Sequence, residues 1–143
     1  MNIGLIAPAA ALGLAAIGSA LGTGAAGQAS MGAWKKCFAA NKSAPYMLVV
    51  FSGAPITQTI YGFMLMLFIQ GSQKDPLTLL SVGIFGGLAI GFSAMMQGRA
   101  AAGAADALAD TGKGTANYLT VIGIIETVAL FVTVFLFLVL VIL

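Results

Sequence analysis

The chain has 143 residues, of which 60% are hydrophobic and only 7% are charged, whereas soluble domains carry about 25% charged residues. Six basic and four acidic side chains cannot coat a soluble globule of this length, so most of the surface must face lipid. The absence of His and the single Cys exclude Ser-His-Asp and Cys-His catalytic centres, a disulfide framework and a cysteine-rich metal site. The net charge of +2 indicates neither nucleic-acid binding nor a basic membrane-surface helix.

Charge-free stretches divide the chain into four candidate membrane spans, each long enough for the roughly 20 apolar residues that a spanning helix needs. Residues 1–34, 43–73 and 76–98 contain no charge, and residues 114–143 contain one, Glu126. A closed β-barrel would need short strands of alternating polarity, and the Ala, Gly, Leu and Met runs show no alternation. We therefore predict an all-α membrane protein with four helices, near residues 5–31, 46–70, 77–104 and 117–142.

The basic residues predict the orientation. Five of the six lie in or beside the first and third loops, and only Lys74 lies in the second loop. By the positive-inside rule, the first and third loops are expected to be cytoplasmic and both termini to lie outside the cell membrane. The first helix has no basic segment before it, unlike a secretory signal, so we expect it to remain in the mature protein. The five basic residues are Lys35, Lys36, Lys42, Arg99 and Lys113.

An internal repeat relates the two halves of the chain. A shift of 74 positions pairs Gly13 with Gly87 and Ser19 with Ser93, and a shift of 68 positions pairs Gln58-Thr59 with Glu126-Thr127. One helical hairpin thus occurs twice, at residues 1–72 and 73–143, with Gln in the first copy where the second has Glu.

Small residues recur at helical spacing in the first and third helices, which favours close helix packing in lipid. One interpretation is packing within a single four-helix bundle, which would explain one helix face lined by small residues. The first helix has small residues on more than one face, which indicates an inner ring of neighbouring copies. The second and fourth helices, which have bulkier side chains, would then lie outside. The two stripes are Ala9, Gly13, Ala16, Ala20, Gly24 and Gly27, and Gly83, Gly87, Gly91, Ala94, Gly98 and Ala101.

Glu126 is the candidate functional residue. It follows the expected start of its helix by nine residues, which places it about 14 Å into a hydrocarbon core about 30 Å thick. An ionised carboxylate at that depth costs at least about 2.5 kcal/mol, so an intramembrane acid indicates a functional site. The alternative is a protonated Glu that hydrogen-bonds between helices in a purely structural role.

Other polar side chains could join Glu126. Thr57, Gln58 and Tyr61 share one face of the second helix, and Ser93 and Gln97 share one face of the third. In addition, Pro55 cannot donate to the Phe51 carbonyl and tends to kink the helix. Hydroxyl, amide, carbonyl and carboxylate oxygens suit a hard cation. A proton would need only the carboxylate, whereas sodium would use the neutral oxygens, and the occupied site would be electrically neutral and able to face lipid.

The segment Pro55-Ile56-Thr57-Gln58-Thr59-Ile60-Tyr61-Gly62, with Gln97-Gly98-Arg99 and Glu126-Thr127, resembles the proteolipid (K or c) subunit of V-type rotary ATPases, and is most similar to sodium-translocating bacterial forms. The resemblance implies a doubled hairpin that forms a homo-oligomeric rotor ring in lipid. It also implies a stator subunit that supplies an arginine, a central stalk near the cytoplasmic loops, and ATP hydrolysis in a separate soluble head. The chain itself would then be non-catalytic.

The resemblance also implies a set of sodium ligands, with the proton as the alternative ion. These are the Glu126 carboxylate, the Thr57 hydroxyl, the Gln58 and Gln97 side-chain oxygens and the Ala54 carbonyl, with Tyr61 hydrogen-bonded to Glu126. Two positions depart from the family pattern: Ala54 replaces a bulkier residue, and Ile56 replaces a small one. Lys35, Lys36, Cys37 and Lys42 are expected to form a solvated cytoplasmic rim.

Two rival functions remain open at this point. A small multidrug or cation antiporter also has four short helices and one membrane Glu, but its Glu lies in the first helix, where this chain has no acid. A structural four-helix membrane protein would need Glu126 for assembly rather than for ion transport.

Overall fold

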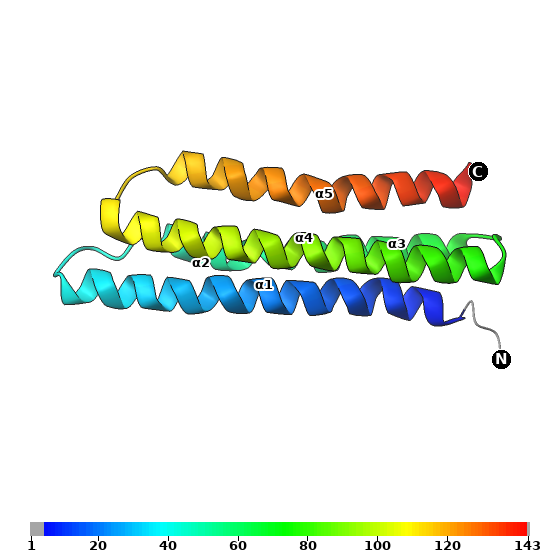
Figure 1. Ribbon diagram of the computed structural model, residues 1–143, viewed down its shortest axis with the longest axis horizontal. Coiled ribbons are helices and arrows are strands. Elements are labelled where there is room, and N and C mark those ends of the chain that lie inside the picture. Colours follow the sequence, from blue (N-terminus) through cyan, green and yellow to red (C-terminus); the bar gives the residue numbers. More distant parts are fainter. Residues whose placement is uncertain (1–4, 143) are drawn as a thin grey trace.

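The computed structural model describes residues 5–142 and is entirely helical, with no strand in that range (Figure 1). Residues 1–4 and 143 lie outside the described part of the chain, and so do the predicted positions of the two termini. The elements, in order, are α1 (Ile6–Ala39), α2 (Met47–Gly53), the 3-10 helix η2 (Ala54–Ile56), α3 (Thr57–Gly71), α4 (Pro76–Thr111) and α5 (Thr115–Val141).

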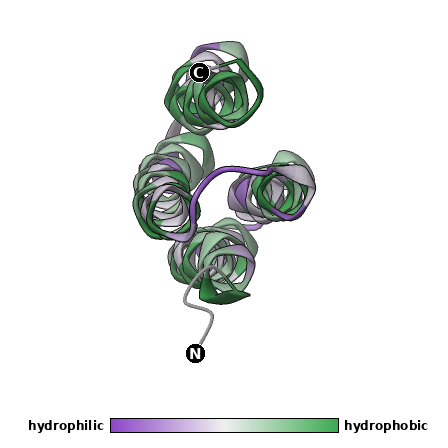
Figure 2. Cartoon of the chain, turned by 90° about the vertical axis from the view of Figure 1, so that its right-hand side faces the viewer, coloured by the Kyte–Doolittle hydropathy of each residue, from purple (hydrophilic) through white to green (hydrophobic). Residues whose placement is uncertain are grey.

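Four spans are long and apolar enough to cross a membrane, because α2, η2 and α3 run on as one interrupted helix over Met47–Gly71. This finding confirms the predicted all-α class. Two antiparallel hairpins lie side by side, so that α1 begins and α5 ends at the same end of the molecule (Figure 1). Seen end-on, α4 lies between α1 and α5, and the α2–α3 span packs beside them (Figure 2). α5 is the least covered helix, and many of its large apolar side chains are exposed.

The tightest packing joins α1 to α4, one helix from each hairpin. Gly18 lies on Gly91, and Gly22 lies on Gly98, so closely that a Cβ atom at either position of α1 or at Gly98 would overlap the backbone opposite. Small residues allow this approach where lipid provides no hydrophobic driving force between helices.

The two predicted small-residue stripes have different surroundings. The stripe of α4 is buried along its whole length. The stripe predicted for α1 is exposed or half-buried within one chain, and added Cβ atoms at its three glycines would meet nothing within 4 Å. α1 instead buries a neighbouring face against α4 and α3, which includes Ala7, Ala11, Ala15, Gly18, Gly22 and Ala26.

α1 extends eight residues beyond its predicted end at residue 31, which corrects the predicted helix boundary. Of the four residues expected in a solvated rim, Lys35, Lys36 and Lys42 are exposed, and Cys37 is not. Lys35, Lys36 and Cys37 lie on the helix, and Lys42 alone lies in the loop that follows. Cys37 is only 2% exposed and belongs to a core cluster with Leu108. The helix continues because Cys37 and other small residues of this end keep packing against α4.

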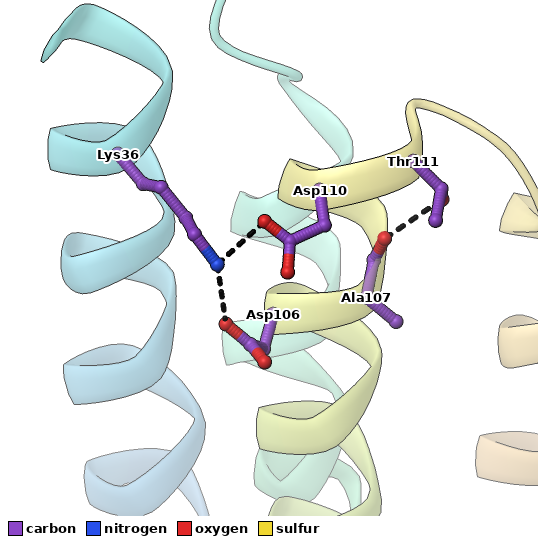
Figure 3. A network of polar contacts seen from close by, with 5 residues as sticks. All are labelled: Lys36, Asp106, Ala107, Asp110 and Thr111. Atoms are coloured by element: carbon purple, nitrogen blue, oxygen red, sulfur yellow. Dashed lines mark hydrogen bonds and ion pairs between the residues drawn. The ribbon is translucent and has the colours of Figure 1, made fainter. Parts of the chain in front are cut away.

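α4 likewise extends past its predicted end at residue 104, to Thr111. Arg99 is therefore an exposed residue about three turns inside the helix rather than at the loop. Beyond it, the Lys36 ammonium group lies 2.5 Å from Asp110 Oδ1 and 3.4 Å from Asp106 Oδ1, which joins the ends of α1 and α4 (Figure 3).

The start of α4 has a well-formed N-cap. Asp75 Oδ1 accepts hydrogen bonds from the backbone N–H groups of Leu77 and Thr78, and Oδ2 accepts one from the Thr78 hydroxyl. Pro76 occupies the first helical position, where its missing N–H costs nothing. The pKa of the exposed Asp75 carboxyl is lower than its usual value. The main cause is the hydrogen bond from the Thr78 hydroxyl, and the second is the hydrogen bond from the Thr78 backbone N–H.

Candidate ion-binding site

Glu126 lies eleven residues after the start of the 27-residue helix α5, close to its middle. Its side chain is half-buried, whereas Ile124 and Val128 on the same helix are more than half exposed. At about 1.5 Å per residue, Glu126 is about 16 Å from the helix start. The carboxylate therefore lies near mid-membrane depth, beside a surface that faces lipid.

Two other helices donate hydrogen bonds to the Glu126 carboxylate. The Tyr61 hydroxyl of α3 lies 3.3 Å from Oε1, and the Gln97 amide nitrogen of α4 lies 3.3 Å from Oε2. Each carboxylate oxygen thus has its own donor, and the three helices meet at one side chain.

The network continues from Gln97 into α3. The Gln58 amide nitrogen donates to Gln97 Oε1 at 2.8 Å, and both Gln side chains are completely buried. The Thr57 hydroxyl lies 3.2 Å from Gln58 Oε1 and 3.0 Å from the Ala54 carbonyl, and can donate its proton to either. Buried amides are costly unless they are hydrogen-bonded, and here they bond to each other.

The interruption at Pro55 sets the position of the first ligands. Over Ala54–Ile56 the helix tightens to 3-10 geometry, and the backbone N–H of Thr57 bonds to the Ala54 carbonyl, three residues back. The same carbonyl is the one that the Thr57 hydroxyl reaches. Spacing alone pointed to the Phe51 carbonyl as the backbone ligand, and the resemblance pointed to that of Ala54. Of the two, the Ala54 carbonyl is the one that joins the hydrogen-bonded network.

All six residues expected at the site therefore lie in one connected set, drawn from η2, α3, α4 and α5. They are Ala54, Thr57, Gln58, Tyr61, Gln97 and Glu126.

Ser93 is a supporting residue that the sequence-based ligand set did not include. Its hydroxyl donates to the Ile125 carbonyl at 2.9 Å, and the Gln97 amide nitrogen also lies 3.1 Å from the Ile122 carbonyl. These contacts hold α5 against α4 at the residue before Glu126 and about one turn before it. The signal for Ser93 was its pairing with Ser19 in the internal repeat, together with its place on the Gln97 face.

The chemistry of the set is one carboxylate among neutral oxygen and amide groups. In residues 5–142 no basic side chain forms an ion pair with Glu126, and no three His, Cys, Asp or Glu residues gather as a metal cluster. Such a set suits a hard monovalent cation, or a single proton on the carboxylate, better than a transition metal.

Comparison with protein families gives a match over the second hairpin. Residues 80–139, which span most of α4 and α5, match the family model of the C subunit of ATP synthase. No curated protein matches the chain. The matched segment contains Gln97 and Glu126, and proteins of this family form homo-oligomeric membrane rings. The match covers less than half of the chain; it supports a multi-pass membrane proteolipid, and it shows that residues 80–139 are similar to ATP synthase C subunits.

Proposed function

We propose that the chain is the rotor-ring subunit of a V-type ATPase, and that each copy carries one sodium ion across the membrane during ATP-driven rotation. The observation that supports this function best is the connected network from Ala54 to Glu126. It gathers one carboxylate and several neutral oxygens near the middle of a membrane span.

Sodium is favoured over the proton because a proton needs only the carboxylate. The two buried Gln side chains and the Thr57–Ala54 pair would then have no part in binding. A sodium ion needs several oxygens around one negative charge, and rotation of the Gln97 amide about its last torsion would turn its oxygen toward Glu126. Because the Gln97 oxygen now accepts from the Gln58 amide, the Gln58 amide would have to turn as well and present its own oxygen.

Loading changes the cost of turning the ring through lipid. An ionised Glu126 facing hydrocarbon costs at least about 2.5 kcal/mol, whereas Glu126 with a bound cation forms a neutral site. Each copy would therefore pass through lipid only when it is loaded. Release would need a positive charge from a stator subunit, since Arg99 of this chain is not part of the network. The central stalk would dock at the ends of α1 and α4 near Lys36.

The test is labelling of Glu126 with a hydrophobic carbodiimide, in the assembled protein at fixed pH, with and without sodium. We expect sodium to protect Glu126 in a concentration-dependent way, and potassium at equal ionic strength to protect it less. Labelling that slows as pH rises but ignores sodium would identify a proton carrier instead. Failure to label under any condition would contradict a carrier site that opens to lipid.

The antiporter hypothesis makes a different prediction. In a four-helix antiporter, lipophilic cations would compete with the carbodiimide at Glu126, because they would bind beside the same carboxylate. We expect such cations to leave labelling unchanged, and competition by them would favour the antiporter.

A further inference from the structure

Two hydroxyl groups of α1 lie buried outside the network around Glu126. Ser19 is 4% exposed, and the hydroxyl oxygens of both Ser19 and Thr23 are shielded from the surface. Within residues 5–142 they are the two buried side-chain polar atoms that have no hydrogen-bond partner. Buried polar groups are nearly always bonded to protein or to ordered water.

These hydroxyls face the interrupted span of α2, η2 and α3. One turn before Ser19, Ala15 packs against Gly62 of α3. Two turns after Thr23, the Ser30 hydroxyl donates to the Leu48 carbonyl of α2 at 3.1 Å. Residues at these spacings share one face of a helix. Ser19 and Thr23 therefore lie between two observed contacts, at the level of the 3-10 break.

The break offers acceptors for these donors. Pro55 faces α1, since its Cβ would lie 2.9 Å from a Cβ added at Gly22. The Phe51 carbonyl points along the helix toward Pro55, which has no N–H to give it. A backbone acceptor without its helical donor thus lies on the side of α2 that faces the two hydroxyls.

The internal repeat gives independent support. A shift of 74 positions pairs Ser19 with Ser93 and Thr23 with Gln97. In the second hairpin, Ser93 and Gln97 both donate to backbone carbonyls of α5. In the first hairpin, Thr23 is shorter than Gln97, so it cannot span the same distance. A bridging molecule would supply the missing length.

We propose that Ser19 and Thr23 hold a buried water molecule, which links α1 to the Phe51 backbone carbonyl at the break before Pro55. Water suits a site with two hydroxyl donors and a carbonyl acceptor, because a buried water makes about three hydrogen bonds. A cation does not suit it, since no carboxylate lies in the first hairpin near this level and an uncompensated charge in the membrane is costly.

The bound water keeps the 3-10 break fixed against α1, and the break in turn positions the Ala54 carbonyl and Thr57. The inference does not depend on the proposed ion, because a structural membrane protein with this fold would hold the same water.

The experiment compares the assembled wild-type protein with the double variant Ser19→Ala, Thr23→Val. In a high-resolution structure of the wild-type protein, we expect a water peak within hydrogen-bond distance of both hydroxyls, and its loss in the variant. Density that shows both hydroxyls bonded to the carbonyls of their own helix, with no water, would overturn the proposal.

Thermal unfolding gives a second readout, because a bound water and a dry, unpaired pair of hydroxyls predict opposite changes in Tm for the double variant. If the hydroxyls hold water, the double variant leaves the Phe51 carbonyl without a hydrogen-bond partner and lowers Tm. If they are dry and unpaired, their removal relieves a buried polar group and raises Tm. The control is Thr133→Val, since Thr133 is as buried as Ser19 but its hydroxyl donates to the Ala129 carbonyl of its own helix. A Tm for the double variant equal to or above that of the control would refute the bound water.

Discussion

At the scale of single residues, Glu126 derives its properties from its neighbours. Tyr61 and Gln97 each donate to one of its oxygens, and Gln58 holds Gln97 in place. The acceptor oxygens that a cation would use, on Thr57, Gln58 and Ala54, lie one step further along the same network. Removal of the carboxylate and removal of a neutral group should therefore have different effects.

We expect Glu126→Gln to abolish sodium transport by the assembled complex while the protein still assembles. Gln keeps the size of Glu and can still bond to Tyr61 and Gln97, but it has no charge to neutralise a cation. Sodium uptake into proteoliposomes and the size of the purified assembly are the two measurements. Thr127→Val is the control, because the exposed Thr127 hydroxyl bonds only to the Ile124 carbonyl of its own helix. Retained transport in Glu126→Gln would refute Glu126 as the carrier.

We expect Gln97→Leu to weaken sodium binding without removing the reactive carboxylate. A leucine at this position would lack the oxygen ligand and would leave the buried Gln58 amide unpaired. A loss of about 1.4 kcal/mol would raise the sodium concentration for half-protection of Glu126 about tenfold. Carbodiimide labelling over a sodium titration measures this change. An unchanged titration curve would exclude Gln97 from the ligand set.

At the scale of helices, the spans were predictable because the bilayer imposes a minimum apolar length, which the charge-free stretches reveal. Helix ends outside the bilayer were not predictable in this way. The ends of α1 and α4 depend on contacts between two helices, such as the Lys36–Asp110 ion pair and the burial of Cys37. The interruption at Pro55 was predictable from the missing N–H, but its tightening to 3-10 geometry was not.

We expect the cap at Asp75 to make the stability of the second hairpin depend on pH. The pKa of Asp75 is lowered in the folded protein by its bonds to Thr78, so the cap stabilises fully above the unfolded-state pKa of about 3.9. The stabilisation is lost as pH falls through the lower folded-state pKa. Asp75→Ala should lower Tm at pH 7 and should converge with the wild type in strong acid. Thermal unfolding across pH checks this, and a constant difference in Tm would contradict it.

At the scale of the whole molecule, the two hairpins are held together by backbone approach between α1 and α4. The small-residue stripes predicted close helix packing but favoured contacts between neighbouring copies, with packing within one bundle as the alternative. The sequence could not show which face of α1 meets α4, because α1 is small on several faces. The exposed stripe from Ala9 to Gly27 is left for contacts that one chain does not contain. Spacing placed Thr57, Gln58 and Tyr61 on one helix face, whereas Ala54 was expected only from the family resemblance. The α5 carbonyl that Ser93 reaches depends on the register between α4 and α5.

We expect Gly98→Ala to destabilise the protein, because the new methyl group would overlap the backbone of Gly22 and force α1 and α4 apart. Gly103→Ala is the matched control on the same helix, since a Cβ there meets nothing within 4 Å. Ala also favours helix over Gly by about 1 kcal/mol, so the control should be neutral or stabilising within the protomer. Thermal unfolding of both variants tests this, and a Gly98→Ala variant at least as stable as the control would contradict the packing.

The pairing of Gln58 with Glu126 in the internal repeat determines how many ions the proposed rotor carries per turn. Each copy in a ring of such chains has two hairpins but only one acidic side chain near mid-membrane depth, Glu126, so a full turn moves half as many ions as there are hairpins. Each ion then corresponds to a larger angle of rotation. For a given amount of ATP hydrolysed per turn, more free energy is available for each ion, and the complex can pump against a steeper gradient. With an amide, Gln58, in place of a second carboxylate, the proposed rotor moves fewer ions per turn and has more free energy available for each ion.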